Sequence, residues 1–252
     1  MLYFKCEYVL ERDDYMDKKV VLITGGAKGL GKSLAKKFAS LKYNVVITYL
    51  NSYNEAVTLK NELESDCLVD VLILKCDISK DDDVRIALEE IKNKYGHIDI
   101  LINNAAISMD NYYLDKTKDE FMRVLEVNLY GTFLVTRESL KLMNNGLVLN
   151  ISSLDSLTTY SPYNMDYSAS KAGINNLTMN FNDNVTNNSF KVFILPWIAT
   201  ESVLEMEPIY LQKELARTNQ KKLLDVDYVA DFIVSNMDSK DVIICLKGDN
   251  NE

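Results

Sequence analysis

Short runs of β-branched and aliphatic residues alternate with longer segments of helical period from Lys18 onward, and this alternation limits the chain to few folds. The runs that predict strands are Val20–Thr24, Asn44–Tyr49, Asp70–Lys75, Ile98–Asn103, Gly146–Ser152, Phe190–Leu195 and Asp241–Leu246. Their nearly continuous Val, Ile and Leu content is typical of parallel strands buried on both faces. We therefore expect an α/β fold, a doubly wound parallel sheet of about seven strands with helices on both faces.

Between these runs, apolar residues recur three and four positions apart, which predicts the covering helices. The helical segments are Gly31–Leu41, Ser52–Glu64, Asp81–Tyr95, Asp119–Met143, Asp166–Asn184 and Asp227–Met237. No internal repeat or Pro/Gly-rich linker divides the chain, so we expect a single domain over residues 18–252. Residues 1–17 are interpreted as an N-terminal extension, in which Met16 could be an alternative start.

Composition excludes several classes of function. The 28 Lys and Arg against 37 Asp and Glu give a net charge of -9, which would repel a nucleic-acid backbone. One histidine and four scattered cysteines form neither a Cys-x-x-Cys pair nor a ligand cluster, which argues against a metal site. The cysteines are interpreted as reduced thiols, and no apolar run suits a signal peptide or a membrane span. We expect a cytoplasmic protein that binds no nucleic acid and no membrane.

A cluster of glycines follows the first predicted strand. Four of the nine glycines, Gly25, Gly26, Gly29 and Gly31, fall within seven residues directly before a predicted helix. Glycine permits positive φ and close approach of the backbone to a ligand, and a helix N-terminus offers free N–H groups to a phosphate. The spacing lacks the Gly-Lys-Ser/Thr ending of an ATP-binding P-loop. Although such glycines can also form a turn without a ligand, the cluster predicts a pyrophosphate site.

The end of the second predicted strand bears on which dinucleotide binds. Tyr49 is followed by Leu50, Asn51 and Ser52, with no acidic residue where an NAD site binds the ribose 2′-hydroxyl. Lys28, inside the glycine turn, could pair with a 2′-phosphate or could be an ordinary solvated lysine. These features favour NADP(H) over NAD(H).

Tyr167 and Lys171 lie four residues apart at the start of a predicted helix, so their side chains share one face. An adjacent ammonium stabilises a phenolate and is expected to lower the tyrosine pKa from its usual value of about 10. Such a tyrosine can protonate a carbonyl oxygen while hydride reaches the carbon, or take the proton in the reverse reaction. The pair therefore predicts interconversion of a carbonyl and an alcohol.

Two further polar residues could complete this site. Ser153 follows the fifth predicted strand and could polarise the same carbonyl, with Ser152 and Ser156 as alternatives. Asn128, in the predicted helix before that strand, could hold a water that relays protons to Lys171. Singly, such residues are more often caps, turn residues or satisfied polar groups.

In their order along the chain, these motifs resemble the short-chain dehydrogenase/reductase family from Lys18 to about Gly248. The resemblance rests on Thr24-Gly25-x-x-x-Gly29-x-Gly31, Asn103-Asn104-Ala105-Ala106, Asn128, Ser153 and Tyr167-x-x-x-Lys171. Within the family, the chain is most similar to bacterial 3-oxoacyl-[acyl-carrier-protein] reductases. The resemblance implies a Rossmann-type fold, NADPH-dependent reduction of a 3-oxoacyl thioester, a small-molecule or acyl-carrier-protein-linked substrate, and a homodimer or homotetramer. Alcohol, sugar and steroid dehydrogenases of the same family are alternatives.

The resemblance also implies a role for each matched residue. Tyr167 would be the acid/base, Lys171 would bind the nicotinamide ribose and tune Tyr167, Ser153 would orient the substrate, and Asn128 would belong to the proton relay. The residues implied to border the cofactor are Gly25, Lys28, Gly29, Leu30, Gly31, Asp77, Ile78, Asn103, Ala105, Tyr167, Lys171, Pro196 and Ile198.

Some positions depart from the family pattern. Pro196 lacks the glycine that usually follows it, and the chain does not end in the family's paired glycines. These departures motivate a second hypothesis, a non-catalytic dinucleotide-binding sensor. Residues 201–224 correspond to a mobile helix over the substrate in relatives, and their apolar residues could line a hydrophobic site or pack in the core. His97 is given no catalytic role.

Overall fold

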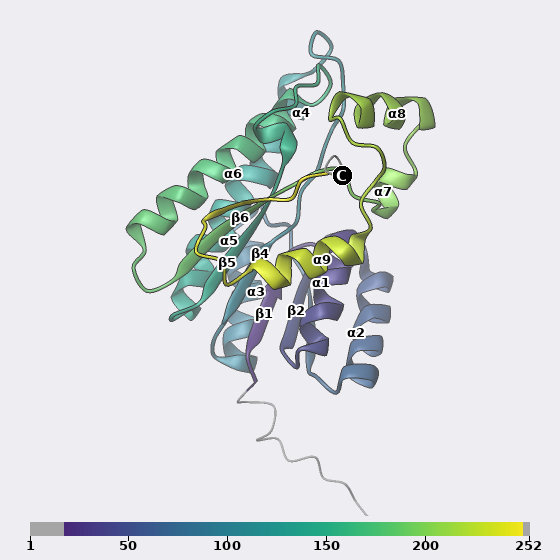
Figure 1. The fold of residues 1–252 in the computed structure, drawn as a ribbon. Helices are drawn as coiled ribbons and strands as arrows, with labels where there is room; N and C mark the ends of the chain where they lie inside the picture. The colour runs from purple at the N-terminus through teal and green to yellow at the C-terminus, as the bar shows by residue number, and fades with distance from the viewer. Residues whose placement is uncertain (1–17, 249–252) are drawn as a thin grey trace, which may run out of the picture.

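The computed structural model describes residues 18–248, so the extension expected over residues 1–17 lies outside the described residues. The strands are β1 (Val20–Ile23), β2 (Asn44–Tyr49), β3 (Val71–Lys75), β4 (Ile100–Asn103), β5 (Leu147–Ser153), β6 (Ser189–Leu195) and β7 (Ile243–Cys245). They form one sheet of seven parallel strands in the order β3-β2-β1-β4-β5-β6-β7 (Figure 1). This order confirms the predicted doubly wound fold.

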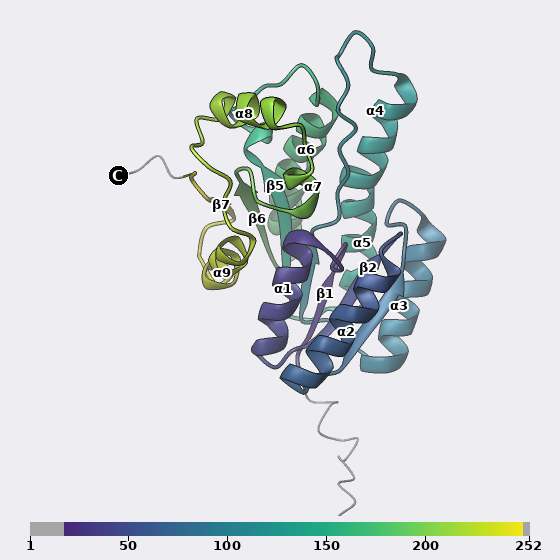
Figure 2. The ribbon, with the colours of Figure 1, turned by 90° about the vertical axis from the view of Figure 1, so that its right-hand side faces the viewer.

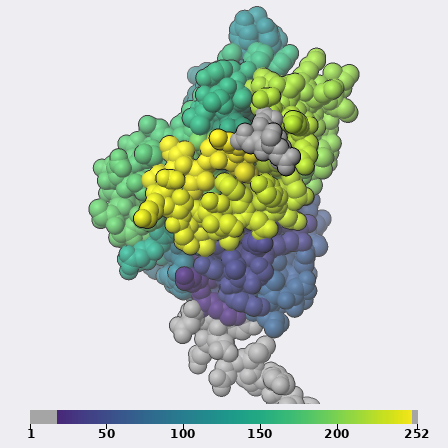
Figure 3. All heavy atoms as spheres, in the orientation of Figure 1, coloured from purple at the N-terminus to yellow at the C-terminus, as the bar shows by residue number. Residues whose placement is uncertain are grey.

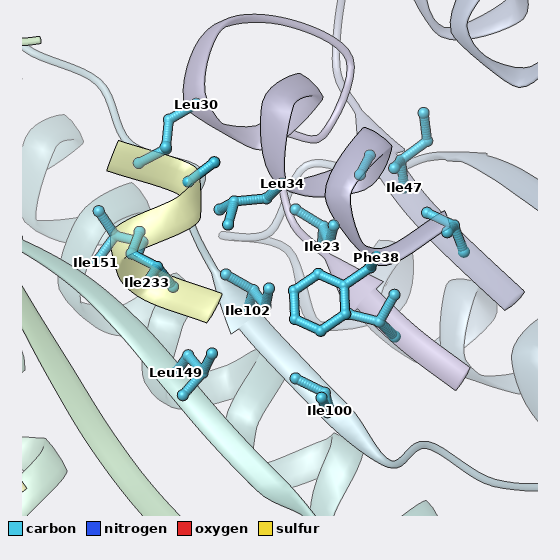
Figure 4. Packing of buried hydrophobic residues seen from close by; sticks show 14 of the residues in the cluster. Ile23, Leu30, Leu34, Phe38, Ile47, Ile100, Ile102, Leu149, Ile151 and Ile233 are labelled. Atoms are coloured by element: carbon cyan, nitrogen blue, oxygen red, sulfur yellow. The ribbon is translucent and has the colours of Figure 1, made fainter. Parts of the chain in front are cut away.

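Helices cover both faces of the sheet (Figures 1 and 2). One face carries α1 (Gly29–Ser40), α2 (Tyr53–Cys67) and α9 (Val226–Asn236), and the other carries α3 (Asp81–Tyr95), α4 (Lys118–Leu125), α5 (Thr132–Ser139) and α6 (Met165–Asn184). On the first face, Leu34 and Phe38 of α1 pack with Ile233 of α9 in a buried cluster (Figure 4). In the space-filling view, α9 lies directly against α1 (Figure 3). Burial of these apolar faces supplies the main driving force for the fold.

The segment predicted as one helix over Asp119–Met143 is divided by a π-helical turn, η2 (Glu126–Gly131), between α4 and α5. Gly131 lies so close to Ile78 that an added β carbon would be 2.9 Å from the Ile78 Cγ1. The prediction of a continuous α-helix is therefore wrong, because one extra residue per turn leaves little trace in apolar periodicity. Single π-helical turns are frequent at functional sites, and this one carries Asn128.

The region after β6 forms two short helices rather than one. These are α7 (Glu201–Leu204) and α8 (Pro208–Arg217), which lie beyond the carboxyl ends of the central strands (Figure 2). The Glu207 carboxylate caps α8 by accepting hydrogen bonds from the Ile209 and Tyr210 N–H groups. The separate cap explains why the chain starts a new helix at Pro208.

Hydrogen bonds join the segments that follow β1 and β4. The Thr24 Oγ1 accepts from the N–H groups of Asn104 and Ala105, both at 3.0 Å. The Asn104 Nδ2 donates to the carbonyls of Thr24 and Gly25, at 3.0 and 3.1 Å. Because the strand order reverses between β1 and β4, this is the switch point where open α/β sheets bind ligands.

A buried ion pair fixes the loop between β4 and α4 to the start of α6. The Lys116 Nζ lies 2.9 Å from the Asp166 Oδ2 and also donates to the Met109 carbonyl. The two paired side chains are 7% and 0% exposed. Backbone hydrogen bonds between residues 111–113 and 162–163 hold the same loop. These contacts therefore hold the loop against the first turn of α6.

We expect Gly31→Ala to lower the free energy of unfolding by about 2 kcal/mol, because a β carbon there meets backbone that cannot move freely. That carbon would lie 2.5 Å from the Gly25 carbonyl oxygen and 2.6 Å from the Asn104 Nδ2. Urea denaturation measures the change. Ser40→Ala, at the exposed end of the same helix, is the control and should shift stability by about 0.5 kcal/mol or less. Equal losses in both variants would contradict this packing.

Lys116→Met should cost about 3–5 kcal/mol of unfolding free energy, since it leaves the buried Asp166 carboxylate without its partner. The double variant Lys116→Met/Asp166→Leu removes both charges and should recover most of that loss. Both are compared with the unchanged protein in urea. A double variant no more stable than the single one would show that the pair does not act as described.

Candidate active site

Two adjoining cavities lie at the carboxyl ends of the strands. The first, here called the glycine-turn cavity, has a volume of about 480 Å³ and includes Gly25 and Gly29 in its wall. The second, the tyrosine cavity, has a volume of about 300 Å³ and includes Tyr167. Four residues, Ala106, Ile107, Thr200 and Ser202, line both. One elongated ligand could therefore extend from one cavity into the other.

The glycine turn has the geometry of an anion site. Gly25 and Gly29 have φ values of +63° and +51°, in the left-handed region that favours glycine. A β carbon at Gly25 would lie 3.1 Å from the Ala105 Cα. At the start of α1, the Gly29 N–H donates to the Glu201 Oε2 at 3.0 Å. A carboxylate on this N–H group is a stand-in for a phosphate oxygen, so the residues present fit a dinucleotide pyrophosphate.

Most residues implied to border the cofactor lie in the wall of the glycine-turn cavity. They are Gly25, Lys28, Gly29, Leu30, Asp77, Ile78 and Ala105. Gly31 packs behind the turn instead. The side chain of Asn103 points into the interior, where its Nδ2 donates to the Thr136 Oγ1 at 2.9 Å and the Asn150 Oδ1 at 2.8 Å. The next residue, Asn104, lines the cavity in its place.

Asp77 is held by groups from two directions. Its Oδ1 accepts from the Ser79 N–H and hydroxyl, and its Oδ2 lies 3.0 Å from the Arg123 Nη2. Burial raises the pKa of the Asp77 carboxyl, but the hydrogen bonds from Ser79 and Arg123 outweigh it and the net pKa is lowered. Arg123 lines the same cavity. Its place there could not be predicted from the sequence, because a single arginine on a helix has no distinguishing pattern.

Lys28 has a partner outside the glycine turn. Its Nζ lies 2.7 Å from the Glu55 Oε1, and both side chains are exposed. The Glu55 carboxylate raises the pKa of Lys28. Tyr49 and Leu50 line the cavity after β2 without contributing an acidic group. A 2′-phosphate at Lys28 would therefore compete with Glu55.

Tyr167 and Lys171 are brought together as predicted, with the Lys171 Nζ 5.5 Å from the centre of the Tyr167 ring. Lys171 is buried and donates to the Ile151 carbonyl at 2.8 Å, and burial lowers its pKa to about 8. Burial raises the pKa of Tyr167, the Asp155 carboxylate raises it further, and the Ser153 hydroxyl opposes both. The expectation of a lowered tyrosine pKa is therefore wrong here, because burial outweighs the neighbouring groups.

The three serines near the end of β5 have different environments. Ser153 interacts with the Tyr167 phenol, and both residues line the tyrosine cavity. The Ser152 hydroxyl is buried and donates to the Lys171 carbonyl at 3.3 Å. The Ser156 hydroxyl donates to the Ser153 carbonyl and accepts from Asn175. Ser153 is thus the best placed of the three to meet a substrate.

Asn128 joins three parts of the site, and within residues 18–248 its side chain hydrogen-bonds to Ile107 and Ser170 rather than to Lys171. Its Oδ1 accepts from the Ile107 N–H at 2.8 Å, and its Nδ2 donates to the Ile107 carbonyl at 2.9 Å. The same Nδ2 lies 3.1 Å from the Ser170 Oγ, one residue before Lys171. The side chain links η2, the loop after β4 and α6, while its part in a proton relay stays a prediction.

The remaining predicted positions divide between the site and other regions. Pro196 and Ile198 line the tyrosine cavity, as does Met206 after α7. Ile209, another apolar residue of the segment 201–224, is exposed. His97 lies at the amino end of β4, with its Nε2 3.2 Å from the Asp99 Oδ2, and lines neither cavity.

Curated proteins similar to this chain include 3-oxoacyl-[acyl-carrier-protein] reductases. A 3-oxoacyl-[acyl-carrier-protein] reductase from Staphylococcus epidermidis is 30% identical over 164 residues, which are 64% of this chain and 66% of that protein. The corresponding reductase from Aquifex aeolicus is 36% identical over 159 residues, 62% of this chain and 63% of that protein. The chain thus matches slightly less than two thirds of these relatives' own lengths, and the predicted likeness to such reductases is confirmed.

Solved structures share the fold. A short-chain dehydrogenase from Burkholderia cenocepacia, in complex with NADP, has a TM-score of 0.84 at 21% identity, covering 93% of this chain and 98% of that one. A short-chain dehydrogenase/reductase from Burkholderia phymatum, in complex with NAD, has a TM-score of 0.80 at 18% identity, covering 92% and 89%. The model of the short chain dehydrogenase family matches residues 19–205. The chain therefore belongs to the short-chain dehydrogenase family of NAD(P)-dependent oxidoreductases.

Proposed function

We propose that the chain is an NADPH-dependent reductase that converts a carbonyl to an alcohol. The observation that carries this proposal is the meeting of Ser153 and Tyr167 in a cavity that shares its wall with the glycine-turn cavity. Gly29 and the start of α1 would hold the pyrophosphate, and Asp77 and Ile78 would border the adenosine. Lys28 would bind the 2′-phosphate, exchanging its ion pair with Glu55 for it.

The cofactor, when bound, supplies hydride to the carbonyl carbon. In this mechanism, Ser153 donates a hydrogen bond to the carbonyl oxygen and Tyr167 gives that oxygen its proton. The raised pKa of Tyr167 suits this direction, because it keeps the phenol protonated at neutral pH. Lys171, behind the ring, would bind the nicotinamide ribose and supply positive charge as the phenol loses its proton.

We further propose a 3-oxoacyl thioester, free or linked to an acyl carrier protein, as the substrate. The names of the curated relatives support this class. Leu154, Leu195, Val203 and Met206 give the tyrosine cavity apolar walls for an acyl chain. A cytoplasmic location is part of the same proposal, and no helix in residues 18–248 is long and apolar enough to cross a membrane.

A homodimer or homotetramer also belongs to the proposal. On the outer side of the segment from α4 to α6, several apolar side chains line an open groove: Met122, Leu125, Leu129, Phe133 and Leu177. A second copy of the chain could cover this groove.

Tyr167→Phe should reduce the rate of NADPH oxidation with an acetoacetyl thioester by about 100- to 10,000-fold, because the variant has no proton to give. NADPH should still bind, which fluorescence titration measures. Tyr163→Phe is the matched control: Tyr163 is an exposed tyrosine before the same helix, and its variant should keep the rate. Binding without turnover in the unchanged protein, on any carbonyl or alcohol tested, would instead support the sensor hypothesis.

The kcat/KM for NADPH should fall as pH rises above about 8, because Lys171 loses its charge there while Tyr167 stays protonated. Lys171→Arg keeps a positive charge to much higher pH. The pH above which kcat/KM decreases should therefore be higher in this variant, even if its maximum rate is lower. If kcat/KM decreases at the same pH in both proteins, the group that titrates is not Lys171.

A further inference from the structure

The start of α7 is seated on the glycine turn. The Glu201 Oε2 accepts from the Gly29 N–H at 3.0 Å, although the two residues are 172 positions apart. A β carbon at Gly29 would lie 3.2 Å from the Thr200 Cγ2 and 3.6 Å from the Glu201 Oε2. Figure 2 shows α7 directly above the start of α1. An N–H group at the start of α1, where a phosphate would bind, is therefore already hydrogen-bonded to a carboxylate of this chain.

Other charged side chains lie close to the contact between Glu201 and the glycine turn. The first turn of α1 contains no acidic residue of its own, so Glu201 provides the carboxylate near its positive end. The charges of Glu55, Glu201 and Glu205 all raise the pKa of Lys28. One ammonium group thus lies among three carboxylates at the mouth of a cavity that should receive a polyanion.

The position of α7 connects this contact to the rest of the site. Thr200, Glu201, Ser202 and Glu205 line the glycine-turn cavity. Thr200 and Ser202 also line the tyrosine cavity, together with Val203. The segment forms part of the partition between the two cavities, so Glu201 lies between two residues that border the cavity proposed for the substrate.

We propose that Glu201 is a built-in competitor for the cofactor pyrophosphate and sets the affinity of the chain for its dinucleotide. This inference rests on the proposed dinucleotide site. A carboxylate and a phosphate oxygen cannot both take the single Gly29 proton, and their like charges repel each other. Binding therefore requires the Glu201 carboxylate to leave the Gly29 N–H, and the free energy of that contact is subtracted from the binding free energy.

Isothermal titration calorimetry with NADPH and with NADH tests this proposal on the full chain. Glu201→Gln keeps the shape of the side chain and removes its charge, and it should lower the Kd for NADPH about fivefold, as expected for a charge at a helix terminus. Glu205→Gln is the matched control, because it removes an equal charge from the same cavity wall, and in the described part of the chain the Glu205 carboxylate makes no hydrogen bond to the turn. Its Kd should change less than about twofold.

The possible results are distinct. A Kd in Glu201→Gln that is equal to or above that of the unchanged protein would overturn the competitor role, while NADPH binding itself would leave the proposed function intact. Equal tightening in both variants would show that the total charge matters, not the contact with Gly29, and would also overturn it. If neither dinucleotide binds to any of the three proteins, the proposed function fails and this inference fails with it. Circular dichroism confirms that the variants are folded.

Discussion

The Thr24 hydroxyl joins the ends of β1 and β4, and the arrangement of both cavities depends on that link. It fixes the glycine turn against the loop that begins at Asn104. Three residues further on, Ile107 borders both cavities and exchanges two hydrogen bonds with Asn128. Asn128 in turn contacts Ser170 in the helix that carries the proposed acid. Hydrogen bonds, together with the backbone between Ala105 and Ile107, thus connect the anion site to the helix that carries the proposed proton donor.

At Tyr167 and Lys171, burial affects the pKa values more than neighbouring charges do. It favours the neutral form of both Tyr167 and Lys171, which raises the pKa of the phenol and lowers that of the ammonium. A phenol that keeps its proton is an acid rather than a base, which agrees with a reductive role. The buried Asp155 carboxylate strengthens this tendency, and it forms an ion pair with Arg217 of α8 at 3.0 Å.

Much of the fold could be predicted because buried parallel strands and amphipathic helices leave local patterns in the sequence. Tyr167 and Lys171 could be paired because one helical turn separates them. The contact between Gly29 and Glu201 could not, since it joins distant segments that share no local pattern. The choice between Asn103 and Asn104 depends on which way each side chain points at the end of β4, and neighbouring side chains there point in opposite directions.

A crystal structure of the protein with NADP⁺ tests the central claim most directly, because it shows whether one dinucleotide spans the two cavities. The account predicts the pyrophosphate at the N-terminus of α1, the adenosine beside Asp77, and the nicotinamide in the tyrosine cavity. The nicotinamide C4 should face the space between Ser153 and Tyr167. A dinucleotide bound elsewhere, or one whose nicotinamide points away from Tyr167, would contradict it.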